Sequence, residues 1–193
     1  MKKLTREDLF SLEKYSAIRN DFRNKVIAHK KQRRVQIGAH AALYFEDALT
    51  MQYQVQEMLR IERIFEADGI QDELDVYNPL VPDGHNWKAT FMVEYDDVEE
   101  RKKALSRLIG IEKSVWLQVE GHDRVFAIAN EDLERGTPDK TSAVHFMRFE
   151  LSPAMIAAVK QGAQITAGID HPAYHESTVL QPAERNSLAG DLH

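Results

Sequence analysis

The chain has 193 residues, of which 43% are hydrophobic and 29% are charged, and it contains no cysteine. This size and composition predict one globular domain. The missing cysteines exclude disulfides, thiolate zinc sites, cysteine nucleophiles and iron–sulfur clusters bound by this chain. The formal net charge of -6 argues against a dedicated nucleic-acid-binding protein, because such domains are usually basic. No apolar run approaches the ~20 residues that cross a membrane, and no signal peptide is recognisable, so we expect a soluble cytoplasmic protein.

The chain begins with a helical pattern over residues 4–31. Apolar residues recur there at helical spacing, and Thr5 and Asp8 are placed to cap the first turn. A break near Asn20 would divide the segment into two helices. The N-terminal segment is therefore expected to pack by one apolar stripe.

Residues 33–46 alternate between apolar and polar side chains around Gly38, which is typical of a short hairpin. A long helix is expected over 47–67, because no Gly or Pro interrupts it before Gly69. A shorter helix is expected over 70–77.

The remainder of the chain predicts a sheet with packed helices. Alternating apolar runs indicate strands at 87–95, 115–120, 124–129, 142–151 and 164–169. Glycine stops and helix-starting prolines indicate helices at 97–108, 153–162 and 182–189. A helix between strands 142–151 and 164–169 would make them parallel within one sheet.

The expected fold class is α+β, with a helical N-terminal third packed on a mixed, largely antiparallel sheet. We expect a single domain over 1–193, with the helical part at about 1–78 and the sheet part at about 86–193. The loop from Pro79 to Pro82 joins the two parts.

Several separated segments, in this order, resemble the bacterial family designated domain of unknown function 3501. They are 29–35, 54–66, 77–80, 145–151 and 168–174. The resemblance covers nearly the whole chain and implies no established activity or catalytic residues. It implies a redox partner, because members of the family are encoded beside rubrerythrin-like proteins and iron–sulfur oxidoreductases.

The helix expected over 47–67 places two carboxylates at its apolar stripe. The stripe consists of Ala48, Met51, Val55, Met58, Leu59 and Phe65. Glu62 falls near its middle, and Glu66 lies one turn further along. Because a buried carboxylate is costly without a partner, we expect Glu62 to be buried and to meet an Arg or Lys. The two carboxylates could form salt bridges, or they could act as metal ligands or acid–base groups.

His145 lies in a row with Met147 and Phe149 that alternation directs into the core. A lone histidine on an apolar face is more often a satisfied core residue than a ligand. The alternative is a site for iron, zinc or manganese built from Glu62, Glu66 and His145. The sequence requires no cofactor, and it has no repeated Glu-x-x-His pair of the ferritin-like kind.

Asp170, His171 and His175 follow the strand expected over 164–169. The histidine spacing suits a metal on a helix, but Pro172 argues against a helix there. Alternatively, Asp170 accepts a hydrogen bond from His171 and stiffens a turn. Parallel strands would place His145 and His171 at opposite ends of the sheet, so we expect them not to share a site.

Residues 19–34 form a basic cluster that contains one acid, Asp21. The side chains that we expect to contact an anion or a partner are Arg23, Lys30, Lys31, Arg33 and Arg34. The alternatives are a solvated face or ion pairs with carboxylates of the helices. Few aromatic residues are interleaved, which makes nucleic acid a less favoured ligand.

Three hypotheses remain open from the sequence. The leading one is a non-catalytic accessory or binding protein that works with a redox partner. The second is a small metalloenzyme or metal carrier with Glu and His ligands, and the third is an anion or nucleic-acid binder through residues 19–34. The sequence contains no P-loop, Gly-x-Ser-x-Gly or His-Glu-x-x-His motif, which disfavours the common nucleotide-binding, hydrolase and protease families.

Overall fold

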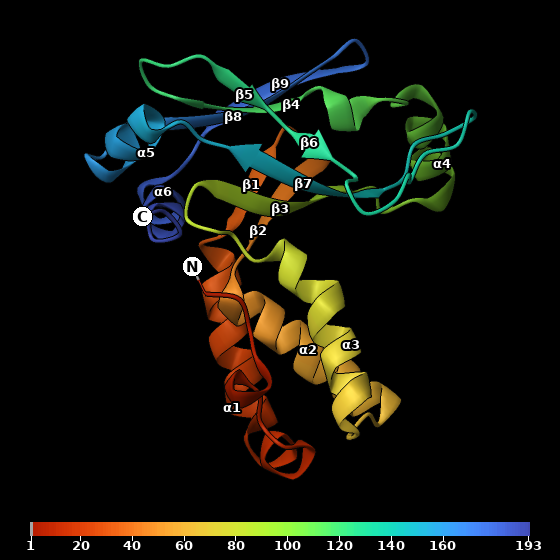
Figure 1. Ribbon diagram of the computed structural model, residues 1–193. Coiled ribbons are helices and arrows are strands. Elements are labelled where there is room, and N and C mark those ends of the chain that lie inside the picture. Colours follow the sequence, from red (N-terminus) through yellow and green to blue (C-terminus); the bar gives the residue numbers. More distant parts are fainter. Residues whose placement is uncertain (1) are drawn as a thin grey trace.

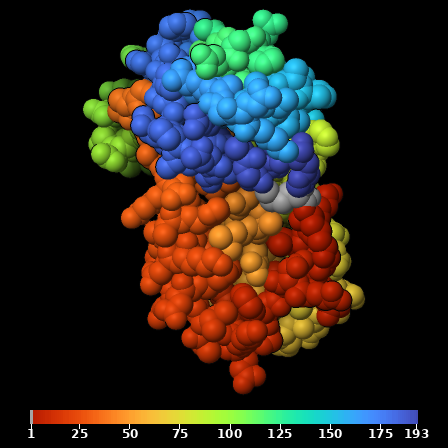
Figure 2. All heavy atoms as spheres, turned by 90° about the vertical axis from the view of Figure 1, so that its left-hand side faces the viewer, coloured from red at the N-terminus to blue at the C-terminus, as the bar shows by residue number. Residues whose placement is uncertain are grey.

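The computed structural model, which describes residues 2–193, places a helical lobe below two antiparallel β-sheets (Figure 1). Turned by 90°, the helical lobe forms the lower body and the C-terminal segment lies at the junction between lobe and sheets (Figure 2). The expected α+β class is confirmed. No helix among the described residues is long and apolar enough to cross a membrane.

The helical lobe is built from three helices that follow the short 3-10 helix η1 (Arg6–Asp8). They are α1 (Leu12–Lys31), α2 (Ala48–Glu62) and α3 (Ala67–Tyr77). The Thr5–Asp8 capping box forms as expected, and α1 runs through Asn20 without a break. One apolar stripe of α2 packs against α3 and the N-terminal segment, and its buried members are Met51, Val55 and Leu59.

The first sheet has the strand order β1-β2-β3-β7-β6. Its strands are β1 (Arg34–Ile37), β2 (Ala41–Glu46), β3 (Asn86–Val93), β7 (Val144–Glu150) and β6 (Ile128–Ala129). The expected hairpin over 33–46 supplies β1 and β2, so the N-terminal third of the chain contributes directly to this sheet.

The second sheet has the order β5-β4-β8-β9. Its strands are β5 (Arg124–Phe126), β4 (Val115–Val119), β8 (Ile165–His171) and β9 (Tyr174–Val179). The core lies between the two sheets and includes Leu43, Phe91, Phe149, Leu117, Ile165 and Ile169. The sheets meet at one side, where the Tyr174 hydroxyl donates to the Ile37 carbonyl at 2.7 Å.

Shorter helices close the ends of these sheets. They are η2 (Asn78–Leu80), α4 (Val98–Arg107), η3 (Ile111–Lys113), α5 (Pro153–Lys160) and α6 (Pro182–Ala189). The expectation of parallel strands 142–151 and 164–169 in one sheet is wrong, because α5 carries the chain from β7 in one sheet to β8 in the other. Strand β9 was not expected: its residues are mostly polar and exposed, as on an edge strand.

The long helix expected over 47–67 ends before its apolar pattern ends in the sequence. It ends at Glu62, where Arg63 turns the backbone with a left-handed φ of 56°. Gly69, expected as a helix stop, instead lies inside α3. The apolar stripe therefore continues in the sequence beyond the end of the helix, which is why Phe65 is 69% exposed.

Arg33 joins the helical lobe, the first sheet and the C-terminus. Its side chain is 2% exposed, and its guanidinium donates to the carbonyls of Phe45 and Glu46 at 3.0 and 3.1 Å. It also binds the Asp191 carboxylate at 2.6 Å and lies 3.5 Å from that of Asp47, the N-cap of α2. Burial raises the pKa of Asp191 to about 6 even beside this cation.

The first prediction concerns this joint. Arg33→Met should lower the free energy of unfolding by about 3–5 kcal/mol, because Asp191 would stay buried without its counter-ion and Asp47 would keep only His29 as a partner. Urea denaturation followed by circular dichroism measures the loss. The matched control is Lys31→Met, an exposed residue at the end of α1, for which we expect a change within about 0.5 kcal/mol. A loss below about 1 kcal/mol for Arg33→Met would contradict the role of this joint.

Candidate binding groove

A groove with a volume of about 540 Å³ lies between the helical lobe and the outer face of the first sheet. One wall is the end of α3 with η2, and the other is the segment 131–135 that precedes β7. The floor is formed by outward-facing residues of β3 and β7. Small-molecule sites in proteins have volumes of roughly 300–1,000 Å³, so the groove is of ligand size.

Half of the residues that line the groove have large apolar side chains or aromatic rings. The apolar side chains are those of Val76, Tyr77, Pro79, Leu80, Leu133 and Phe146. Val76 and Leu133 stand at the rim with 64% and 56% of their surface exposed. These two residues come from separate parts of the chain, so the apolar surface exists only when the lobe and the sheet are assembled.

Two arginines in the groove are neutralised by neighbouring carboxylates. Arg148 binds Glu131 at 2.8 Å and Glu150 at 2.6 Å. Arg135 pairs with Asp132, lowering the pKa of that carboxyl to about 2, and stacks on the Phe146 ring at 4.5 Å. The Arg148–Glu131 ion pair and the stacking of Arg135 on Phe146 hold the segment 131–135 against β7.

Unlike the two arginines, Lys88 on β3 is a cation of the groove that forms no ion pair with the residues described. Within residues 2–193 its ammonium has no hydrogen-bond or ion-pair partner, although the side chain is only partly exposed. Burial lowers the pKa of Lys88. The groove thus combines a largely apolar lining with one cation that forms no ion pair with the described carboxylates.

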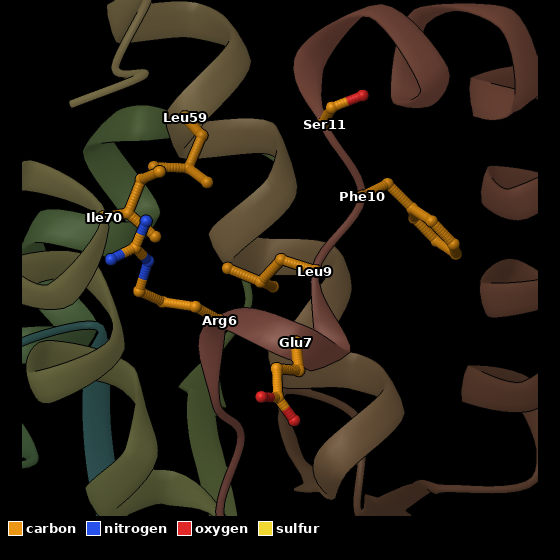
Figure 3. A pocket seen from close by; sticks show the side chains of 7 residues that line it. All are labelled: Arg6, Glu7, Leu9, Phe10, Ser11, Leu59 and Ile70. Atoms are coloured by element: carbon orange, nitrogen blue, oxygen red, sulfur yellow. The ribbon is translucent and has the colours of Figure 1, made fainter. Parts of the chain in front are cut away.

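A second hollow, of about 490 Å³, lies inside the helical lobe (Figure 3). Leu9, Leu59 and Ile70 point toward one another there, with Arg6 beside them, while Phe10 and Glu7 point away. Arg6 is exposed to water, so its charge is solvated without a ligand. We therefore regard the groove at Lys88 as the stronger candidate.

The expectation that Glu62 is buried and paired is wrong. Glu62 is exposed in the last turn of α2, and no ion pair of the described residues includes it. Glu66 is the exposed N-cap residue of α3. The physical reason is the early end of α2, which leaves Glu62 at the tip of the lobe.

The carboxylate that does meet cations on α2 is Glu57. It accepts hydrogen bonds from Arg19 at 2.8 Å and from the Tyr15 hydroxyl at 2.7 Å. The Arg19 guanidinium lowers the pKa of Glu57 to about 2. Gln56 is a buried polar residue of the same helix, and its side chain binds the backbone of Phe10. Sequence reasoning missed both, because it followed the centre of the apolar stripe and not its edge.

His145 is fully buried, as the alternation of β7 predicts. Its Nε2 lies 3.1 Å from the Ser142 carbonyl and 2.9 Å from the Thr141 hydroxyl, and its Nδ1 lies 3.0 Å from the Asn130 amide nitrogen. The Ser142 carbonyl can only accept, so Nε2 carries the proton of the neutral ring and Nδ1 accepts from Asn130. Burial lowers the pKa of His145, which favours this neutral form.

The structure does not bring Glu62, Glu66 and His145 together. Glu62 ends α2 and Glu66 precedes α3, and both are exposed, whereas His145 is a buried residue of β7. Helices α2 and α3 belong to the lower lobe and β7 to the sheets above it (Figure 1). In the described part of the chain, no group of three or more His, Asp or Glu side chains is placed to hold a metal ion.

Asp170, His171 and His175 lie in the β8–β9 hairpin. The expected bond between Asp170 and His171 is absent from the described contacts, and Asp170 instead pairs with Arg124 and, at 3.6 Å, with His175. The turn is stiffened by His171 itself, whose Nδ1 accepts from the Ala173 amide and whose Nε2 donates to the Ile109 carbonyl. His145 and His171 have no hydrogen-bond partner in common.

The basic cluster divides into internal and external residues. Arg33 is buried, and Arg34 binds Tyr44 at 2.8 Å and Glu94 at 2.9 Å, so neither is available as an anion contact. Arg23, Lys30 and Lys31 lie on the surface of α1 and make no ion pair with other described residues. An anion or partner contact through these three stays a prediction.

The sequence and the fold of this chain are similar to those of known proteins. The family model described as "Protein of unknown function (DUF3501)" matches residues 3–192. A crystal structure of a novel protein of unknown function from Burkholderia pseudomallei K96243 is 53% identical, with a TM-score of 0.94 and 100% of both chains covered. None of the curated proteins matches this chain. The resemblance to this family is confirmed.

The second prediction concerns His145. Because its pKa is lower in the folded chain, the unfolded chain binds more protons below about pH 6.5, and His145 reduces stability as the pH falls. His145→Gln should lower the melting temperature at about pH 7.5, and this deficit should shrink toward about pH 5.5. His122→Gln, in the β4–β5 turn, is the control. A deficit for His145→Gln that stays constant with pH would contradict a neutral buried ring.

Proposed function

Since the chain belongs to the DUF3501 family of proteins of unknown function, we propose a function from its groove: it is a binding protein that holds a partly apolar ligand between the helical lobe and the first sheet. This proposal rests on two exposed apolar side chains, Val76 and Leu133, which line the groove from two separate parts of the chain. Exposed apolar surface that lines a concave site is typical of ligand binding.

The walls of the groove are held in place without a ligand. Arg148 anchors the segment 131–135 to β7 through its ion pair with Glu131, and Arg135 of the segment stacks on the Phe146 ring. On the opposite wall, the Asn78 amide exchanges hydrogen bonds with the backbone of Leu4 at 2.8 and 2.9 Å, fixing the start of η2. A preformed groove reduces the entropy cost of binding.

This function agrees with the leading hypothesis from the sequence, an accessory or binding protein. We place it in the cytoplasm, as the composition predicts. The redox partner that the family resemblance implies stays a prediction, and no contact of the described residues bears on it.

The third prediction tests the groove with the neutral fluorescent probe N-phenylnaphthylamine. We expect saturable fluorescence enhancement, because the apolar walls exclude water from the dye. The rim variant Val76→Ser with Leu133→Ser should weaken binding by about tenfold, since it removes apolar contact area on both walls.

The matched control for the rim variant is Val98→Ser, which changes an exposed valine of α4 outside the groove. We expect the control to bind the dye like the wild type. Failure of the dye to bind would overturn the proposal. Loss of binding in Ile70→Ser, with the rim variant unaffected, would also overturn it and would move the site to the hollow in Figure 3.

A further inference from the structure

We infer that Lys88 makes the groove selective for small amphipathic monoanions: molecules with an apolar body and one carboxylate. This inference rests on the binding function proposed above. It names the class of ligand and assigns the residue that recognises its charge.

The position of Lys88 on the floor follows from strand register. On the outer face of the first sheet, Lys88 of β3 lies between Glu46 of β2 and Arg148 of β7. The same row opens into the groove, because Lys88 and Arg148 both line it. A ligand that enters between Val76 and Leu133 therefore meets Lys88 at the floor.

The neighbouring charges leave Lys88 without a counter-ion. Arg148 takes up Glu131 and Glu150 through direct ion pairs. Glu46 lies opposite Lys88, but its Oε1 accepts from the Thr90 hydroxyl at 2.9 Å and no ion pair joins it to the lysine. Among the residues that the structure describes, no carboxylate lies within ion-pair distance of the Lys88 ammonium.

A partly buried ammonium without a partner raises the free energy of the empty groove. Burial is the main reason that the pKa of Lys88 is lowered, and Arg148 acts in the same direction, whereas Glu131, Asp83 and Glu150 raise it. A ligand carboxylate beside the ammonium would supply a charge-assisted hydrogen bond and offset the cost of burial. This gain is available only to an anion.

The number of charges on the ligand is limited by the carboxylates of the same groove. Glu131 and Asp132 line it, and each is already paired with an arginine. One negative charge is matched by Lys88, whereas a second would face these carboxylates without a cation of its own. The groove therefore favours a monoanion over a phosphate dianion.

The test measures displacement of N-phenylnaphthylamine by two ligands of equal chain length, decanoate and decanol. In the wild type, we expect decanoate to displace the dye at about tenfold lower concentration than decanol. In Lys88→Gln this preference should vanish, because decanoate loses the charge that it pairs with, while saturable binding of the dye shows that the groove is still folded. Lys88→Arg should keep the preference, because it keeps the charge.

The control variant is Lys160→Gln, which removes an exposed lysine of α5 outside the groove and should leave the preference intact. Equal preference for decanoate in the wild type and Lys88→Gln would overturn this inference. Displacement by decanol with no advantage for decanoate would overturn it too, while the proposed binding function would stand. If the dye does not bind at all, the proposed function fails and this inference fails with it.

Discussion

The buried guanidinium of Arg33 is the interaction on which the rest of the structure depends. It lies where α1 ends and β1 begins, and it binds the carbonyls at the end of β2, the N-cap carboxylate of α2 and the C-terminal Asp191. An arginine suits this place because its planar group can donate in several directions at once. Without this cation, the Asp191 carboxylate and the two carbonyls would be buried without their donor. Arg33 therefore ties the helical lobe, the first sheet and the C-terminus to one another.

The groove depends on how the helical lobe is joined to the first sheet. One of its walls belongs to α3, which packs on α2 in the helical lobe, and its floor belongs to β3 and β7. The Trp87 indole, on the inner side of β3, donates to the Leu188 carbonyl at 2.9 Å, so the C-terminal helix braces the same strand from behind. The distance between wall and floor is thus set by buried contacts far from the groove. An apolar ligand in the groove would contact both the helical lobe and the first sheet, and its affinity would depend on how rigidly these two parts are joined.

The sequence predicts most of the elements but not their assembly. Periodicity located α1 and the β1–β2 hairpin, although the expected break near Asn20 is absent, and the Pro182 start and Gly190 stop located α6. It failed at Glu62, where the pattern outlasts the helix, because a left-handed residue such as Arg63 leaves no signal of its own. It also placed β7 and β8 in one sheet, since a sequence does not show whether a connecting helix crosses between layers. The outward direction of Lys88 could be predicted from the sequence, because the side chains of β3 alternate between the two faces of the sheet. Its lack of a partner depends on contacts with distant residues, and these cannot be derived from the pattern.

The row of residues that contains Glu46 and Lys88 explains how the folded groove is stable and still binds an anion. Residues that face each other across antiparallel strands have Cβ atoms about 4.5–5.5 Å apart, so these opposite charges could pair after a change of rotamer. Glu46 is 6% exposed, and within the described chain its second oxygen has no hydrogen-bond partner. In the structure Glu46 and Lys88 do not pair, because the Glu46 carboxylate turns to the Thr90 hydroxyl. A ligand carboxylate therefore reaches the Lys88 ammonium without displacing an internal partner. A neutral apolar molecule gains nothing from the lysine, so this row of the sheet gives the groove its preference for an anion.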